Sequence, residues 1–142
     1  MIADGAARPP SRTPPGGLVS TIDDYLALGA MMLNQGKFGR ERILSRLSAE
    51  AMTTDQLTPE QQASAGFFLG EDRGWGFGVS IITRRNDVAA VPGRFGWDGG
   101  LGTSWYSDAR EEMVAILMTQ VLGFPSGIDR DFWTSVYQAI DD

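Results

Sequence analysis

Apolar residues recur at helical spacing in two separate stretches of the chain. In the first stretch the buried face is predicted to consist of Ile22, Tyr25, Leu26, Gly29, Met32 and Leu33. This helix is expected to begin at Ser20 or Thr21, which are both good N-caps, and to end by Gly36. Near the C-terminus the same spacing is found for Phe132, Trp133, Val136, Tyr137 and Ile140. Asp129 or Asp131 is the predicted cap of this terminal helix.

Between these helices the pattern changes to alternation. Trp75, Phe77, Val79 and Ile81 alternate with smaller residues, which is typical of a half-buried strand. Strands are also predicted at residues 103–106 and in the apolar run 113–118, which is typical of a central or doubly covered strand. A second, shorter helix is predicted over residues 43–54, and a loop with at most one helical turn over residues 58–72. The chain is therefore predicted to be α+β, with a three-stranded antiparallel sheet and helices packed on it.

The composition fits one globular domain or part of one. The chain has 142 residues, of which 42% are hydrophobic and 21% are charged. Its formal net charge of −6 lacks the positive footprint of a protein that binds nucleic acid or anionic lipid. No apolar run approaches the roughly 20 residues that a membrane helix requires, and the N-terminal stretch lacks the apolar core of a secretory signal. A cytoplasmic location is therefore favoured, with no nucleic-acid or membrane partner.

The absence of histidine and cysteine removes several classes of enzyme. Neither a Ser-His-Asp site, a Cys-His site nor a zinc site of the Cys/His kind can be built from this sequence. A serine activated by a lysine would need a Ser-x-x-Lys motif. The single lysine is Lys37, and the residue three positions before it is Asn34. The chain therefore carries no complete nucleophilic site, and neither a metal nor a cofactor is predicted.

Glycine is concentrated between two strand-like segments. Four glycines fall within the seven residues from Gly96 to Gly102. Glycine weakens a strand interior, and it often marks a bulge or a close approach of a ligand or another backbone. An isolated Gly-Gly pair would be read as a turn. Because strand-like residues flank the glycines on both sides, we predict a strand whose backbone is approached closely by a ligand or by another backbone.

The triplet Trp97-Asp98-Gly99 resembles the third active-site box of serine β-lactamase-type hydrolases. This group includes class C β-lactamases, penicillin-binding-protein-like peptidases and family VIII esterases, in which the box reads Lys-Thr-Gly, His-x-Gly or Trp-x-Gly. The resemblance extends in the same order to residues 16–25, 51–57 and 74–79. It covers most of residues 16–120, and it is a resemblance to the C-terminal half of that fold only.

The resemblance implies a site built around this triplet. The Gly100 N–H would form an oxyanion hole together with the N–H of the nucleophile, and Trp97, Asp98 and Gly99 would bind substrate. Gly99 and Gly100 are therefore expected on an inner strand edge, with the Gly100 N–H pointing into a cleft. Aspartate at the middle position departs from the usual Thr, Ser or Gly. Tryptophan cannot attract a substrate carboxylate as the lysine of other members does. The triplet therefore favours an ester or another neutral substrate over a β-lactam.

Residue Tyr106 opens a Tyr-Ser-Asp triplet that comes near the family's second box, Tyr-x-Asn. It follows the third box in this chain, so Tyr106 is expected to be a strand residue and not a catalytic base. Trp75 and Trp105 could line a pocket, but a core position is favoured for each. Residues 1–15, with four prolines, are expected to be a flexible arm, and residues 16–142 to be the C-terminal part of a β-lactamase-like domain.

Three interpretations of function follow. The favoured one is a C-terminal fragment of a serine hydrolase that transfers acyl groups from an ester, amide or β-lactam, supplies the oxyanion-hole strand, and is inactive alone. The alternative is a non-catalytic binding or interaction module that keeps the sheet. A third interpretation is an acid/base enzyme that uses Asp98 with another carboxylate. The expected partner is the missing N-terminal half of the domain or a second copy of the chain, because an uncovered sheet edge invites pairing.

Overall fold

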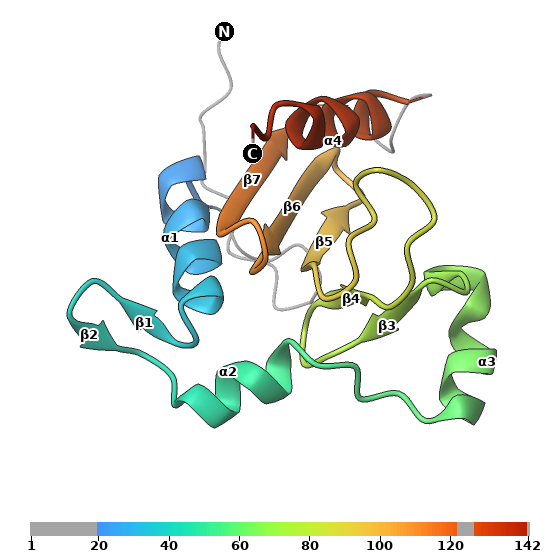
Figure 1. The fold of residues 1–142 in the computed structure, drawn as a ribbon, viewed down its shortest axis with the longest axis horizontal. Coiled ribbons are helices and arrows are strands. Elements are labelled where there is room, and N and C mark those ends of the chain that lie inside the picture. The colour runs from blue at the N-terminus through green and yellow to red at the C-terminus, as the bar shows by residue number, and fades with distance from the viewer. Residues whose placement is uncertain (1–19, 122–126, 142) are drawn as a thin grey trace, which may run out of the picture.

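The chain folds as an α+β structure around a five-stranded antiparallel sheet (Figure 1). The computed structural model describes residues 20–121 and 127–141. The predicted arm at residues 1–15 lies outside the described residues. In the sheet the strands follow chain order, from β3 through β4, β5 and β6 to β7, and a separate two-stranded sheet pairs β1 with β2. The predicted fold class is confirmed, but the sheet has five strands instead of three.

The helix near the N-terminus forms as its periodicity predicts. Helix α1 spans Ile22–Leu33 and begins at the N-cap Thr21, whose hydroxyl accepts the Asp24 N–H at 3.2 Å. Its last turn ends at Asn34, two residues before Gly36, which has a positive φ of 87°. The predicted boundaries are therefore correct to within about one turn.

The next segment differs from the prediction. Strands β1 (Lys37–Phe38) and β2 (Glu41–Arg42) form a short hairpin that the sequence pattern did not indicate. Helix α2 is limited to Arg46–Met52, with Ser45 as its N-cap. The prediction of a loop at residues 58–72 is wrong, because helix α3 spans Pro59–Leu69. A capping box between Thr58 and Gln61, with proline in the first turn, stabilises the start of α3.

The prediction of a single strand over residues 75–81 is also wrong, because the chain reverses its direction within this segment. Strand β3 spans Arg73–Trp75, strand β4 spans Ser80–Ile82, and the two pair antiparallel. The Gly76 N–H donates to the Val79 carbonyl at 2.9 Å, and Gly78 has a φ of 94°. Glycine permits this left-handed turn residue, so the alternation reflected two short strands of one hairpin. The division of one predicted strand into two is one reason why the sheet has more strands than predicted.

The remaining strands match their sequence patterns closely. Strand β5 spans Phe95–Gly99, β6 spans Thr103–Asp108 and β7 spans Met113–Met118. Tyr106 is a residue of β6, as predicted. However, β7 is not a central strand: it lies at one edge of the sheet as described, and most of its residues are half-buried. The apolar run is explained by the alternative of a doubly covered strand, because α1 contacts β7 on one face and α4 contacts it on the other. Its outer edge pairs with no strand of the described sheet.

Different layers cover the two faces of the sheet. On one face, Phe95 and Trp105 pack against Met31 and Met32 of α1. On the opposite face, Tyr106 packs against Trp133 of α4, which spans Ile128–Gln138 (Figure 1).

The cap of α4 is Gly127, so the prediction of an aspartate cap is wrong; Asp129 and Asp131 lie in the first turn. There their charge complements the helix dipole. Among the helices of residues 20–121 and 127–141, none combines the length and apolar character needed to cross a membrane.

Candidate functional site

The triplet Trp97-Asp98-Gly99 forms the last three residues of β5. Trp97 lies opposite Trp105 of β6, and Asp98 lies opposite Ser104. Because successive side chains of a strand point to opposite faces, Trp97 lies on the α1 face and Asp98 on the α4 face. The structure therefore does not bring the side chains of the predicted substrate-binding triplet together in one pocket.

Trp97 belongs to an aromatic cluster formed with side chains of β3 and α3. Its ring centroid lies 4.8 Å from that of Trp75 in β3, at an interplanar angle of 90°, and 5.2 Å from that of Phe68 in α3. Phe68 is 67% exposed, so these three residues form an aromatic wall that is open to solvent. Other exposed apolar side chains on the same elements and their turns are Phe67, Phe77 and Leu101. A core position was predicted for both Trp75 and Trp105. Trp105 is buried in the core as predicted, whereas Trp75 is only partly buried and belongs to the wall.

On the α4 face Asp98 is the centre of a hydrogen-bond network. Its carboxylate accepts from Arg73 Nη1 at 3.0 Å, from the Tyr106 hydroxyl at 2.8 Å and from Ser104 Oγ at 2.6 Å. Ser104 Oγ in turn accepts from Trp133 Nε1 at 2.9 Å. The network therefore links β3, β5, β6 and α4.

The partners of Asp98 determine its chemistry. The acid/base interpretation required a second carboxylate, but within the described part of the chain Asp98 is held by an arginine and two hydroxyl groups. Burial, followed by the neighbouring Asp98 charge, raises the pKa of Tyr106 to about 12. Tyr106 is therefore a neutral hydrogen-bond donor at physiological pH, which agrees with a strand residue that is not a base. The position of Asp98 fits a structural crosslink better than a catalytic acid.

The two glycines that follow Asp98 differ in position. Gly99 is the last residue of β5 and pairs with Thr103, as the expected inner-strand position requires. The same expectation is wrong for Gly100, which lies in the exposed turn after the strand. Within the described residues the Gly100 N–H makes no backbone hydrogen bond, and an added Cβ would meet nothing within 4 Å. This N–H is thus free to bind a ligand, although a turn holds it less firmly than a strand would.

A buried arginine beside this region was not predicted from the sequence. Arg94 directly precedes β5, and only 5% of it is exposed. Its guanidinium carbon lies 4.0 Å from the ring centroid of Tyr106 and 4.1 Å from that of Trp133. The sequence pattern does not indicate this burial, because arginine is usually exposed and Arg94 directly follows the turn residues Pro92 and Gly93.

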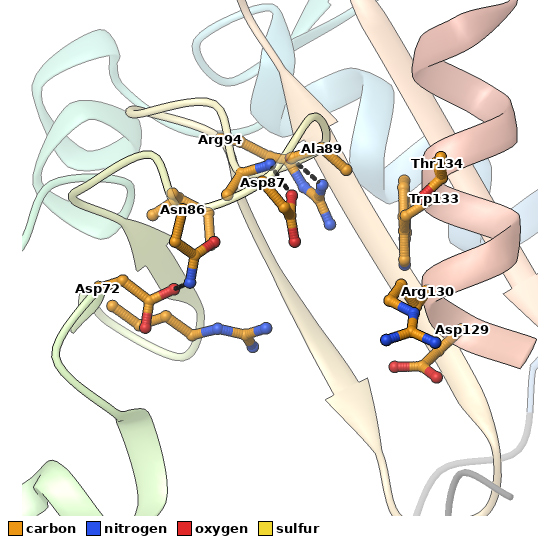
Figure 2. A pocket seen from close by; sticks show the side chains of 12 residues that line it. Asp72, Asn86, Asp87, Ala89, Arg94, Asp129, Arg130, Trp133 and Thr134 are labelled. Atoms are coloured by element: carbon orange, nitrogen blue, oxygen red, sulfur yellow. Dashed lines mark hydrogen bonds between the residues drawn. The ribbon is translucent and has the colours of Figure 1, made fainter. Parts of the chain in front are cut away.

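A cavity of about 240 Å³ lies between residues 83–94 and α4 (Figure 2). Its lining includes Ile82, Asp87, Ala90, Arg94, Trp133 and Thr134, and we refer to it as the Arg94 cavity. It opens on the α4 face, where Arg73 of β3 also lines it. No cluster of three or more metal-ligating side chains occurs within residues 20–121 and 127–141.

Comparison with known proteins identifies the family. The Beta-lactamase family model matches residues 2–137, and the chain belongs to this family. Two curated relatives from Mycobacterium tuberculosis are each 36% identical over 129 residues: "Uncharacterized protein MT1414" of strain CDC 1551 / Oshkosh, and "Protein Rv1367c" of strain ATCC 25618 / H37Rv. Each alignment covers 79% of this chain and 31% of the relative. The chain therefore spans about a third of the length of these relatives.

Proposed function

We propose that this chain supplies one wall and the oxyanion-hole strand of a β-lactamase-like serine hydrolase. The observation that carries the proposal is the Gly100 N–H, which has no backbone hydrogen-bond partner within the described residues and directly follows the triplet at the end of β5. Membership of the Beta-lactamase family supports acyl transfer through a serine ester as the reaction class. An N–H aimed at a developing oxyanion is typically worth about 3 kcal/mol of the activation barrier.

The nucleophile would come from a segment that is not part of this 142-residue sequence. The sequence has no Ser-x-x-Lys and no Tyr-x-Asn, and the relatives are about three times as long as the matched region. The outer edge of β7 has no strand paired to it within the described sheet, so a further segment or a second copy could pair there. We expect the active enzyme to need such a nucleophile-bearing segment, with the present chain inactive by itself.

The aromatic wall favours a neutral substrate with an apolar acyl or alcohol group. Trp97 presents a ring at the position where a lysine would attract a carboxylate, and the exposed Phe68 extends the apolar surface. Asp98 is turned to the other face and is already paired with Arg73. An apolar ester therefore fits this wall better than an anionic β-lactam.

The alternative function, a non-catalytic binding module, has one observation in its favour. Both faces of the sheet carry their own buried cluster, centred on Trp105 on one side and Trp133 on the other. A chain with two such clusters does not need a catalytic partner to bury its main apolar residues. This alternative predicts ligand binding without turnover in every context.

The test of the hydrolase proposal compares two substitutions at Gly100 in the full-length protein that contains this chain. Gly100→Pro removes the N–H, whereas Gly100→Ala retains it and places its methyl group in open space. With p-nitrophenyl butyrate as substrate, we expect Gly100→Pro to lower kcat by about 10²- to 10³-fold. Gly100→Ala is expected to stay within about threefold of the wild type.

Nitrocefin serves as the anionic comparison substrate and is expected to be hydrolysed more slowly than the ester. Equal kcat values for the proline and alanine variants would exclude the oxyanion role of Gly100. Absence of ester and nitrocefin turnover in the full-length protein would instead favour the binding module.

A further inference from the structure

The Arg94 cavity lies on the α4 face of the sheet, and no step of the proposed hydrolysis uses it. Its volume is about 240 Å³. An engineered apolar cavity of roughly 150 Å³ binds a benzene molecule. The Arg94 cavity is therefore large enough for a substituted aromatic ring or an aliphatic molecule of similar size.

The charge of Arg94 is not matched by a close counter-ion. None of the ion pairs in the described part of the chain includes Arg94. Its Nη1 donates to the Ala89 carbonyl, but its buried Nε has no hydrogen-bond partner among the described residues. Burial lowers the pKa of Arg94, although nearby tyrosines and Asp98 favour the charged form. A buried cation with an unused donor is unfavourable unless an anion pairs with it.

The ring faces around Arg94 compensate its charge only in part. Tyr106 and Trp133 each place a ring centroid about 4 Å from the guanidinium carbon, which is close enough for cation–π attraction. An edge of an arginine binds a carboxylate through two parallel N–H···O bonds.

The other charged side chains around the cavity are of both signs: Asp72, Asp87 and Asp129 line it together with Arg73 and Arg130. Asp72 accepts from the Asn86 side chain at 2.6 Å, and Asp87 accepts the Ala90 N–H at 2.7 Å. Figure 2 shows both aspartates on the loop side of the cavity, with Asp129 on the side of α4. Apolar lining comes from Ile82, Ala89, Ala90 and Trp133.

We propose that the Arg94 cavity is a binding site for a small carboxylate with an apolar body. The carboxylate pairs with the guanidinium of Arg94, and the apolar body lies against Trp133 and Ala90. The site is independent of the proposed acyl transfer, and it gives this face of the protein a ligand-binding role of its own.

The first test measures binding of benzoate to the full-length protein by calorimetry in a buffer free of carboxylates. Benzamide has the same size without the charge. We expect saturable 1:1 binding of benzoate, with benzamide at least about tenfold weaker. Benzamide binding as tightly as benzoate, or no saturable benzoate binding up to about 10 mM, would overturn the proposal.

The second test locates the site with variants. Arg94→Gln removes the charge, and Thr134→Trp fills the cavity from α4 while leaving Arg94 in place. Ser135→Trp is the matched control, because Ser135 is the next residue of α4 and is exposed. We expect the first two variants to weaken benzoate binding at least about tenfold and the control to bind as the wild type does. Should Arg94→Gln fail to fold, Thr134→Trp decides: unchanged benzoate binding in that variant contradicts the proposal.

Discussion

At the scale of single residues, Asp98 shows how a chemically suggestive side chain can serve the fold. The sequence places it inside a triplet that resembles an active-site box, yet alternation along β5 turns it toward α4. There it joins Arg73, Ser104 and Tyr106 in one network. Its carboxylate fixes the end of the strand from which Gly99 and Gly100 continue.

Asp98→Asn is expected to lower the free energy of unfolding by about 1–2 kcal/mol, because it removes the charge that pairs with Arg73. This loss of stability is smaller than the loss expected for a fully buried ion pair, because 25% of the Asp98 side chain and 34% of the Arg73 side chain are exposed. Urea denaturation measures the change. Glu111→Gln, in the exposed turn after β6, is the control and is expected to change stability by less than about 0.5 kcal/mol. Equal effects of the two substitutions would show that the network adds nothing to stability.

At the scale of elements, the position of α1 depends on a glycine that faces the sheet. A Cβ added to Gly29 would lie 2.6 Å from Trp105 Nε1 and 2.8 Å from Val114 Cγ1. Glycine is unfavourable inside a helix, so close packing is the reason for its presence in α1. Gly66 in α3 is the opposite case, because an added Cβ there meets nothing within 4 Å.

Gly29→Ala is expected to destabilise the protein by about 1–2 kcal/mol, since overpacking outweighs the gain in helix propensity. Gly66→Ala is expected to stabilise it by about 0.5–1 kcal/mol, because only the propensity changes. Thermal unfolding of both variants gives the comparison. Stabilisation of both to the same extent would mean that α1 can move away from Trp105 without penalty.

The elements that were predicted correctly are those with a long or distinctive pattern. Helix α1 and strands β5 to β7 have enough apolar residues in register to specify their type. The hairpin of β3 and β4 was missed because two short strands joined by glycines keep the alternation of one strand. Helix α3 was missed although Thr58, Pro59 and Gln61 form a recognisable start signal. The Arg94 cavity could not be predicted, because it depends on which loop folds over the sheet.

At the scale of the whole molecule, the two faces of the sheet differ in chemistry. The α1 face is almost entirely apolar, whereas the α4 face contains buried hydroxyl groups, aspartates and an arginine. All three tyrosines have a raised pKa, mainly because of burial. The α4 face holds two of them, Tyr106 and Tyr137.

These tyrosines make the fold sensitive to high pH. A tyrosine in the unfolded chain ionises near pH 10, whereas Tyr106 in the folded state keeps its proton up to about pH 12. Its contribution to stability is complete below pH 10 and is lost as the pH rises through 12. Tyr106→Phe should therefore reduce the loss of stability between pH 10 and 12, by at most about 1.4 kcal/mol per pH unit. Denaturation at several pH values tests this, and parallel curves for the variant and the wild type would contradict it.

The separation of the two faces also has an optical consequence. Of the four tryptophans, Trp105 lies in the α1 layer, Trp133 lies in the α4 layer beside a guanidinium, and Trp75 and Trp97 stand in the partly exposed wall. Because indole emission shifts toward longer wavelengths when water reaches the ring, a chain that retains only one tryptophan reports on one layer. Fluorescence after rapid dilution from denaturant can therefore time the closing of each side of the sheet separately.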